Sequence, residues 1–151
     1  MSGPANEMVH ASAVLVGERA LLIRGPSGSG KSRLAFALLE AARARILPYA
    51  RLVADDRIRI FTTGGRLLAV APEATRGMIE MRGLGIRRVE CEPLALIGLV
   101  VDLAAADGAR LPEARACEIE IHGIKLPRLP ITAGEETFPP VIARLLSAAT
   151  I

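Results

Sequence analysis

The sequence predicts a single α/β domain, spanning residues 1–151, in which a mixed β-sheet carries flanking helices. The chain is 151 residues long, which is typical of one domain, and 51% of its residues are apolar, enough for a sizeable core. Several short apolar segments bounded by glycine, proline or polar residues indicate strands. One segment after a glycine-rich stretch and one at the end of the chain have apolar residues at helical spacing, and both indicate helices.

The first elements surround the glycine-rich stretch. Residues 9–25, VHASAVLVGERALLIRG, predict two short strands on either side of the polar turn at 16–19. The second strand leads directly into the glycines. Residues 32–45, SRLAFALLEAARAR, are strong helix formers with leucine and alanine at helical spacing, and Pro48 ends the helical stretch.

A hairpin is predicted in the middle of the chain. Residues 51–61, RLVADDRIRIF, predict one strand that contains a pair of aspartates. The turn at 63–65 leads to its hairpin partner over 66–71. A loop is expected next, around the two glycines that flank Leu84.

The last third of the chain predicts two strand units and a helix. Residues 94–103, LALIGLVVDL, indicate a buried strand, and residues 104–113 a polar loop. Residues 116–131 predict a hairpin that turns at the His-Gly pair 122–123. Residues 139–149 predict a closing helix with two prolines near its N-terminus.

Composition limits the partners and the compartment. Aromatic residues are 3% of the chain and Trp is absent, which argues against stacking platforms for single-stranded nucleic acid, and the basic residues behind the net charge of +3 are scattered. The longest apolar run, 94–101, is shorter than the ~18 residues of a membrane span, and residues 1–10 lack the pattern of a secretion signal. The two cysteines fit no metal spacing. We expect a cytoplasmic protein without nucleic-acid or membrane partners.

Residues 25–32, GPSGSGKS, match the P-loop pattern G-x-x-x-x-G-K-[ST], in which backbone N–H groups wrap a phosphate chain. A glycine-rich turn with a surface lysine is the alternative, but the flanking strand and helix favour the P-loop. Lys31 can reach the β- and γ-phosphates, and the Ser32 hydroxyl can ligate Mg²⁺. The candidate cofactor-binding residues are Gly25, Pro26, Ser27, Gly28, Ser29, Gly30, Lys31 and Ser32.

A P-loop enzyme also needs a carboxylate near the metal, and a kinase needs one that takes the proton of the acceptor hydroxyl. The pair Asp55-Asp56 and the lone Asp102 both follow apolar strand residues. Adjacent carboxylates repel one another unless a cation is near, which draws attention to the pair. Spacing alone does not choose between Asp56 and Asp102. Glu80 alone would be an ordinary exposed glutamate, and His10 alone a half-buried strand histidine.

Taken together, these segments resemble the HPr kinase/phosphorylase family, specifically its C-terminal catalytic domain. The resemblance covers roughly residues 9 to 90. P-loops are widespread, but VADD followed by E-x-RGLGI is highly specific. The matching segments, in the order of the family, are VHASAV, LLIRGPSGSGKS, RLVADDRI and IEMRGLGI.

The resemblance implies a bacterial protein kinase. Members of the family use ATP and Mg²⁺, or sometimes pyrophosphate, to phosphorylate a regulatory serine of the phosphocarrier protein HPr. They also remove that phosphate by phosphorolysis. The implied fold is a P-loop kinase domain similar to that of phosphoenolpyruvate carboxykinase, assembled as a hexamer. We therefore expect a homo-oligomer that acts on HPr or on its nitrogen-type paralogue.

Roles carried over from matching positions favour Asp56 over Asp102 as the proton acceptor. Arg110 is matched through the short segment GARLPE, as the downstream catalytic arginine of the family. The site implied by the resemblance consists of His10, Lys31, Asp56 and Arg110 as catalytic residues, with Ser32 and Glu80 as Mg²⁺ ligands.

The chain departs from the family in several places. Its sequence resembles a compact form of the family, so we expect no counterpart of the N-terminal domain of the long members, and residues 1–151 contain no recognisable V-R-P-G-R-N-type motif. Kinase activity is therefore implied more strongly than phosphorolysis. Arg33 stands where an acidic residue is usual, and the link over 41–52 is longer.

Two other functions remain open from the residues. A small-molecule kinase would use the same loop, but the chain has no obvious arginine-rich lid segment. A nucleotide-binding sensor would bind ATP and signal by assembly without transferring phosphate.

Overall fold

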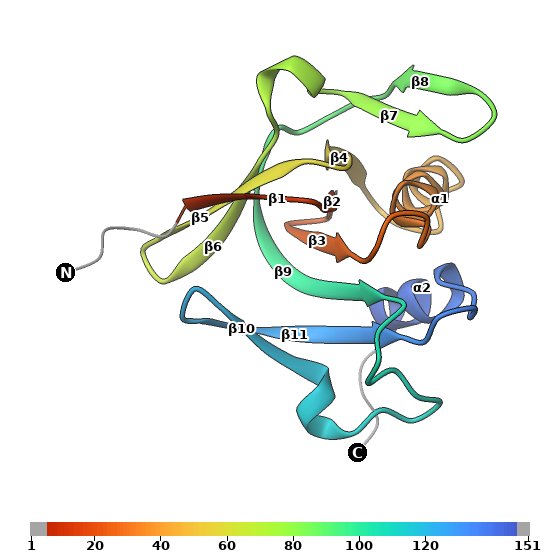
Figure 1. Cartoon of the computed structure of the whole chain (residues 1–151). Coiled ribbons are helices and arrows are strands. Elements are labelled where there is room, and N and C mark those ends of the chain that lie inside the picture. Colours follow the sequence, from red (N-terminus) through yellow and green to blue (C-terminus); the bar gives the residue numbers. More distant parts are fainter. Residues whose placement is uncertain (1–5, 148–151) are drawn as a thin grey trace.

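The computed structural model of the chain, which describes residues 6–147, is a strongly curled mixed sheet with helices on one face (Figure 1). The strands are β1 (Asn6–Val9), β2 (Ser12–Val16), β3 (Arg19–Arg24), β4 (Ala50–Ala54), β5 (Ile58–Thr63), β6 (Arg66–Val70), β7 (Met78–Met81), β8 (Gly85–Arg88), β9 (Leu94–Leu103), β10 (Glu118–Ile121) and β11 (Ile124–Ile131). The helices are α1 (Lys31–Arg43) and α2 (Phe138–Leu146), with 3₁₀ turns η1 (Glu73–Thr75) and η2 (Ala114–Cys117). The predicted mixed sheet with flanking helices is confirmed.

The long strand β9 connects the parts of the sheet. The order is β1-β5-β6-β9-β3-β2-β4, and β11 also pairs with β9 and carries β10. The beginning of β9 pairs antiparallel with β6, whereas its later residues pair parallel with β3 and with β11. Ten residues of β9 therefore join three neighbours, and the strand curves between them in Figure 1.

Four strands end at the same edge of the sheet. β3, β9 and β11 are parallel, and β2 is antiparallel to both β3 and β4, so β4 runs in the same direction as β3. Their carboxyl ends lie side by side, which is where open α/β sheets bind ligands. The loops that follow β3, β4, β9 and β11 thus meet at one edge.

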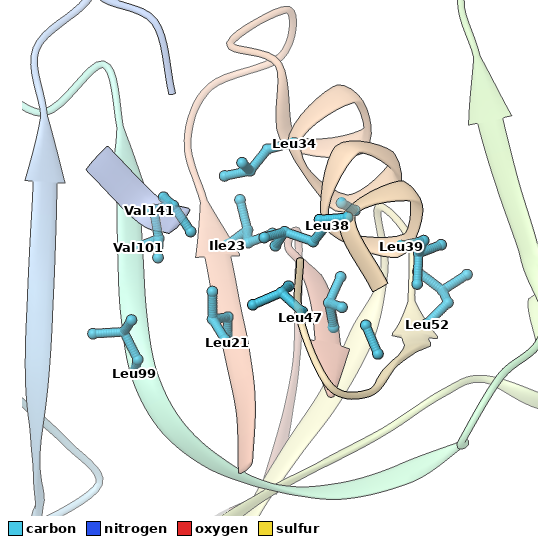
Figure 2. Close-up of a cluster of buried hydrophobic side chains, with 14 of the residues drawn as sticks. Leu21, Ile23, Leu34, Leu38, Leu39, Leu47, Leu52, Leu99, Val101 and Val141 are labelled. Carbon is cyan, nitrogen blue, oxygen red and sulfur yellow. The ribbon is translucent and has the colours of Figure 1, made fainter. Parts of the chain in front are cut away.

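Each face of the central strands contributes to a separate core. In β3, Leu21 and Ile23 pack under the helices, whereas Ala20 and Leu22 face the opposite cluster, as the alternation of a strand requires. Figure 2 shows α1 lying against the first cluster, into which α2 inserts Val141. Burial on both faces explains why β3 reads as a continuous apolar run.

Most predicted elements are present. They include the β2–β3 and β5–β6 hairpins, helix α1, the buried strand β9, the β10–β11 hairpin and helix α2. The turn of the β10–β11 hairpin has positive φ at His122 (49°) and Gly123 (79°), as a tight hairpin turn needs. Residues 148–149 of the predicted closing helix and residues 1–5 of the segment inspected for a secretion signal lie outside the described residues.

One prediction was wrong, and three short strands were not predicted. The single strand over 51–61 is two strands, β4 and β5, because Asp56 adopts a left-handed φ of 67° and the chain turns to pair with different neighbours. The loop expected around Leu84 is present as a tight turn at 82–84, but the strands that it joins, β7 and the fully exposed β8, were not predicted. β1 was not predicted, because its residues NEMV are mostly exposed and carry no apolar alternation.

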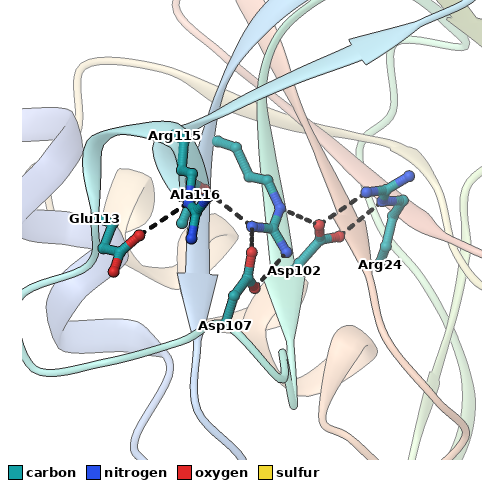
Figure 3. A network of polar contacts seen from close by, with 7 residues as sticks. Arg24, Asp102, Asp107, Glu113, Arg115 and Ala116 are labelled. Carbon is teal, nitrogen blue, oxygen red and sulfur yellow. Dashed lines mark hydrogen bonds and ion pairs between the residues drawn. The ribbon is translucent and has the colours of Figure 1, made fainter.

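A network of charges fastens the ends of β3, β9 and β11 (Figure 3). Asp102 accepts paired hydrogen bonds from Arg24, from Nε at 2.7 Å and from a terminal nitrogen at 2.8 Å. Arg128 donates its Nε–H to the same carboxylate at 2.6 Å. The other guanidinium nitrogens of Arg128 hold Asp107 and the Ala116 carbonyl, so one side chain also ties down the loop after β9. The network lies directly before the P-loop.

The pKa of Asp102 is lowered in the folded chain. Burial alone would raise it, but the hydrogen bonds and charges of Arg24 and Arg128 outweigh that effect. A depressed pKa contributes stability above the ordinary value near 3.8, and that stability is lost as the pH falls through the folded value. The network thus predicts acid sensitivity below about pH 4.

Asp102→Asn should lower the free energy of unfolding by about 3 kcal/mol at neutral pH, because two partly buried guanidinium groups lose their shared anion. Urea unfolding at neutral pH and in steps below about pH 4 measures this difference. The free energies of unfolding of the wild type and the variant should converge as the wild-type Asp102 carboxyl becomes protonated. Glu113→Gln, at an exposed ion pair with Arg115, is the control and should unfold like the wild type. An equally stable Asp102→Asn protein would contradict this role.

Candidate functional site

The P-loop joins β3 to α1 in a close-fitting turn. At Gly25 an added Cβ would lie 2.5 Å from Ser29 Oγ and 3.0 Å from Leu103 Cβ, so only glycine fits there. Gly30 is left-handed, with φ 99°, and α1 begins at the next residue. The first helical hydrogen bond runs from Leu34 N–H to the Gly30 carbonyl, which leaves the three preceding amides without helical acceptors. Free amides at a helix N-terminus are the groups that bind an anion in P-loops generally.

Lys31 lies back across the loop that contains it. Its Nζ donates to the carbonyls of Gly25 at 2.9 Å and Pro26 at 3.2 Å. These bonds place the ammonium group over the first residues of the loop. The positive charge is therefore already located at the turn where phosphate would be wrapped.

Asp55 is the hub of the other side of the site. It is 8% exposed. Its Oδ1 accepts hydrogen bonds from the hydroxyls of Ser32 at 2.6 Å and Ser12 at 2.8 Å. Its Oδ2 accepts the backbone N–H of Glu80 at 3.0 Å. One carboxylate thus joins the P-loop to β2, β4 and β7.

The sequence marked Asp55 only as a member of the Asp55-Asp56 pair and gave it no role of its own. The available signal was its position at the end of a buried strand, beside a second aspartate. Because successive side chains of an extended chain point in opposite directions, one member of such a pair can be buried while the other faces solvent. The structure places Asp55 inside and Asp56 outside.

Asp56 and His10 face each other on the exposed side of this cluster. His10 Nδ1 lies 3.9 Å from Asp56 Oδ1, and the side chains are 72% and 66% exposed. The Asp56 N–H donates to Ser12 Oγ at 3.2 Å, and its carbonyl accepts from Ala11 N–H at 3.2 Å. The exposed carboxylate is therefore held by its backbone and leaves its own oxygens open toward solvent.

The remaining predicted site residues have fewer described contacts with the Asp55 cluster. Glu80 lies on β7, and its backbone joins the cluster through Asp55. Arg110 is exposed in the loop after β9, and within residues 6–147 no hydrogen bond or ion pair links it to the P-loop or to Asp56. Asp102, the other acidic candidate, has both oxygens engaged by Arg24 and Arg128. Its carboxylate therefore belongs to the ion network described above.

The residues around Ser32 fit a phosphate-bound Mg²⁺. Within the described chain, no group of three or more His, Cys, Asp or Glu residues forms a metal cage. Mg²⁺ bound to substrate phosphates needs only one or two protein oxygens beside water. The Ser32 hydroxyl, which bonds to the Asp55 carboxylate, supplies an oxygen of the kind that this ion prefers. None of the helices within residues 6–147 combines the length and hydrophobicity that a membrane crossing requires.

Comparisons with known proteins agree with this architecture. Residues 4–138 match the family model described as the HPr serine kinase C-terminal domain. The HPr(Ser) kinase/phosphatase of Coxiella burnetii has a similar solved structure, with a TM-score of 0.68 and 23% identity over 85% of this chain and 87% of that one. That likeness supports the fold.

Sequence relatives match a shorter region. The HPr kinase/phosphorylase of Clostridium tetani is 44% identical over 66 residues, which are 44% of this chain and 19% of that protein. The HPr kinase/phosphorylase of Clostridium beijerinckii is 40% identical over 78 residues, 52% of this chain and 24% of that protein. The matched region thus spans less than a quarter of either relative. Since the family model covers most of the chain, this protein belongs to the HPr serine kinase C-terminal domain family.

Proposed function

We propose that this chain is a protein kinase that transfers the γ-phosphoryl group of ATP, with Mg²⁺, to a regulatory serine of HPr or its nitrogen-type paralogue. The observation that carries the proposal is the Asp55 cluster, which ties the P-loop serine to an exposed Asp56–His10 pair. Family membership supports the class of reaction. Assembly of several copies is part of the same proposal.

The phosphate-binding role falls to the loop and its lysine. The free amides at the start of α1 and the Lys31 ammonium bind the phosphate chain, and the Lys31 hydrogen bonds to Gly25 and Pro26 hold that charge in place beforehand. Mg²⁺ bound to the phosphates neutralises charge that develops during transfer. Ser32 and Glu80 are its proposed protein ligands, and Asp55 orients both through the bonds described above.

The proposed proton acceptor is Asp56. Its exposed carboxylate takes the proton of the substrate serine as the serine oxygen bonds to the γ-phosphorus and ADP leaves. His10, at 3.9 Å, is close enough to pair with this carboxylate and to limit its orientation. Arg110 is proposed to approach the phosphoryl group when substrate is bound.

The reverse reaction can use the same residue. Inorganic phosphate attacks the phosphorus of phosphoserine, pyrophosphate forms, and the protonated Asp56 returns its proton to the serine oxygen. We propose phosphorolysis as a second activity of this site. It requires no further proton carrier than the one used in the forward direction.

Lys31→Ala should abolish transfer of labelled phosphate from ATP to purified HPr and leave the fold intact. The change removes a charge from the phosphates, whereas the side chain is no part of the core. Circular dichroism and thermal unfolding provide the check on folding. Wild-type transfer by a folded Lys31→Ala protein would rule out this role and, with it, the P-loop mechanism.

Asp56→Asn and Asp55→Asn should have different effects on ATP binding and on phosphate transfer. Asp56→Asn should bind ATP and Mg²⁺ normally but transfer phosphate about 10²-fold or more slowly, since a positioned base is missing. Asp55→Asn should weaken Mg²⁺-dependent ATP binding as well, because its amide cannot accept hydrogen bonds from two hydroxyls and a backbone N–H as the carboxylate does.

Glu120→Gln, on the exposed side of β10, is the control for both variants and should retain binding and transfer. Calorimetric titration measures ATP affinity with and without Mg²⁺, and labelled ATP with HPr measures transfer. Full kinase activity in Asp56→Asn would exclude it as the proton acceptor. ATP binding without transfer in the wild type would favour a nucleotide sensor.

A further inference from the structure

A cavity of about 410 Å³ lies against the P-loop. Its walls are the first half of the loop, residues 26–29, Ala104 after β9, and the segment 132–137 after β11. The volume falls in the range of about 300–1,000 Å³ that is usual for small-molecule sites. The described residues thus form a pocket beside the loop, separate from the acidic cluster.

The pocket and the acidic cluster lie on opposite sides of the P-loop. In the strand order β4-β2-β3-β9, with β11 also on β9, the cluster is built on β4 and β2 and the pocket on β9 and β11. β3, which carries the loop, lies between them, as Figure 1 shows. Ser32, at the end of the loop, bonds to Asp55, whereas the beginning of the loop lines the pocket. A phosphate chain wrapped by the loop therefore has one end at the carboxylates and the other toward the pocket.

The far wall of the pocket is held in place by backbone contacts. Ala105 N–H donates to the Ile131 carbonyl at 2.9 Å, and Glu135 N–H donates to the Thr132 carbonyl at 3.2 Å. The Gly108 backbone packs so closely that an added Cβ would lie 2.6 Å from Thr132 N. The turn that presents Glu135 is therefore formed before any ligand binds.

The chemistry of the lining suits an uncharged group with hydroxyls. No lysine or arginine is among the residues that line the pocket, and Glu135 is the charged residue of that set. A carboxylate would repel a phosphate but accepts hydrogen bonds well from sugar hydroxyls, as acidic residues do for ribose in dinucleotide-binding sites. Ala104, Ala133 and Gly134 leave room for a planar ring.

We infer that this pocket holds the nucleoside of the phosphoryl donor, with the Glu135 carboxylate accepting hydrogen bonds from the ribose hydroxyls. The inference rests on the proposed function, because it places the rest of the nucleotide beyond phosphates bound in the P-loop. It assigns to the segment 132–137 a role in choosing a nucleoside triphosphate over a simple polyphosphate.

Titration of the full chain with ATP, 2′-deoxy-ATP and inorganic tripolyphosphate tests the inference. The wild type should bind ATP more tightly than either of the others. Glu135→Gln should weaken ATP binding about tenfold, lose the preference for ATP over 2′-deoxy-ATP, and bind tripolyphosphate unchanged. Ala133→Leu, which fills the pocket, should reduce binding of both nucleotides and spare tripolyphosphate.

Glu136→Gln is the matched control, because this neighbouring exposed glutamate is not part of the lining, and it should behave like the wild type. Equal affinity of the wild type for ATP and tripolyphosphate, or unchanged ATP binding in both pocket variants, would overturn the nucleoside site and leave the P-loop proposal standing. Failure of the wild type to bind any of the three compounds would overturn both.

Discussion

The Asp55 carboxylate is the interaction on which the candidate site depends. It is buried at the end of β4 and accepts hydrogen bonds from two serine hydroxyls and one backbone amide, which come from three other parts of the chain. A buried carboxylate without such donors would cost several kcal/mol. The three donors therefore cannot move independently, and the P-loop serine, the Asp56 turn and β7 keep a fixed relation to one another.

The second constraint is the ion network at the other side of the loop. Arg24, the last residue of β3, is fixed by Asp102 just before the chain turns at Gly25. The P-loop is thus held at its start by a charged pair and at its end by the Asp55–Ser32 bond. Because both ends are fixed, the loop can keep its amides directed at an anion without help from a ligand, which is the preorganisation that charge-stabilising sites need.

Periodicity and turn residues predicted most of the fold, since buried strands, α1 and the P-loop each carry a strong local signal. The break between β4 and β5 left no such signal: the run RLVADDRIRIF alternates well enough for one strand, and only the contacts of Asp55 with Ser12 and Ser32 reveal why it turns. Resemblance named Asp56, His10 and Lys31, and the structure brings the first two together. The local pattern marked the Asp55-Asp56 pair, but the separate role of Asp55 depends on contacts between distant segments, as does the place of Glu135 beside the P-loop.

The position of β9 has a consequence for the order of folding. The four segments that most closely match the family all lie before residue 90, yet β3, which carries the P-loop, pairs with β9 more than seventy residues later in the chain. Such a distant partner raises the contact order and slows the search for the native topology. A nascent or truncated chain that ends after its motifs would leave β3 with an unpaired edge and Arg24 without Asp102. Such a chain would contain the P-loop, VADD and E-x-RGLGI segments and still be unable to assemble the site.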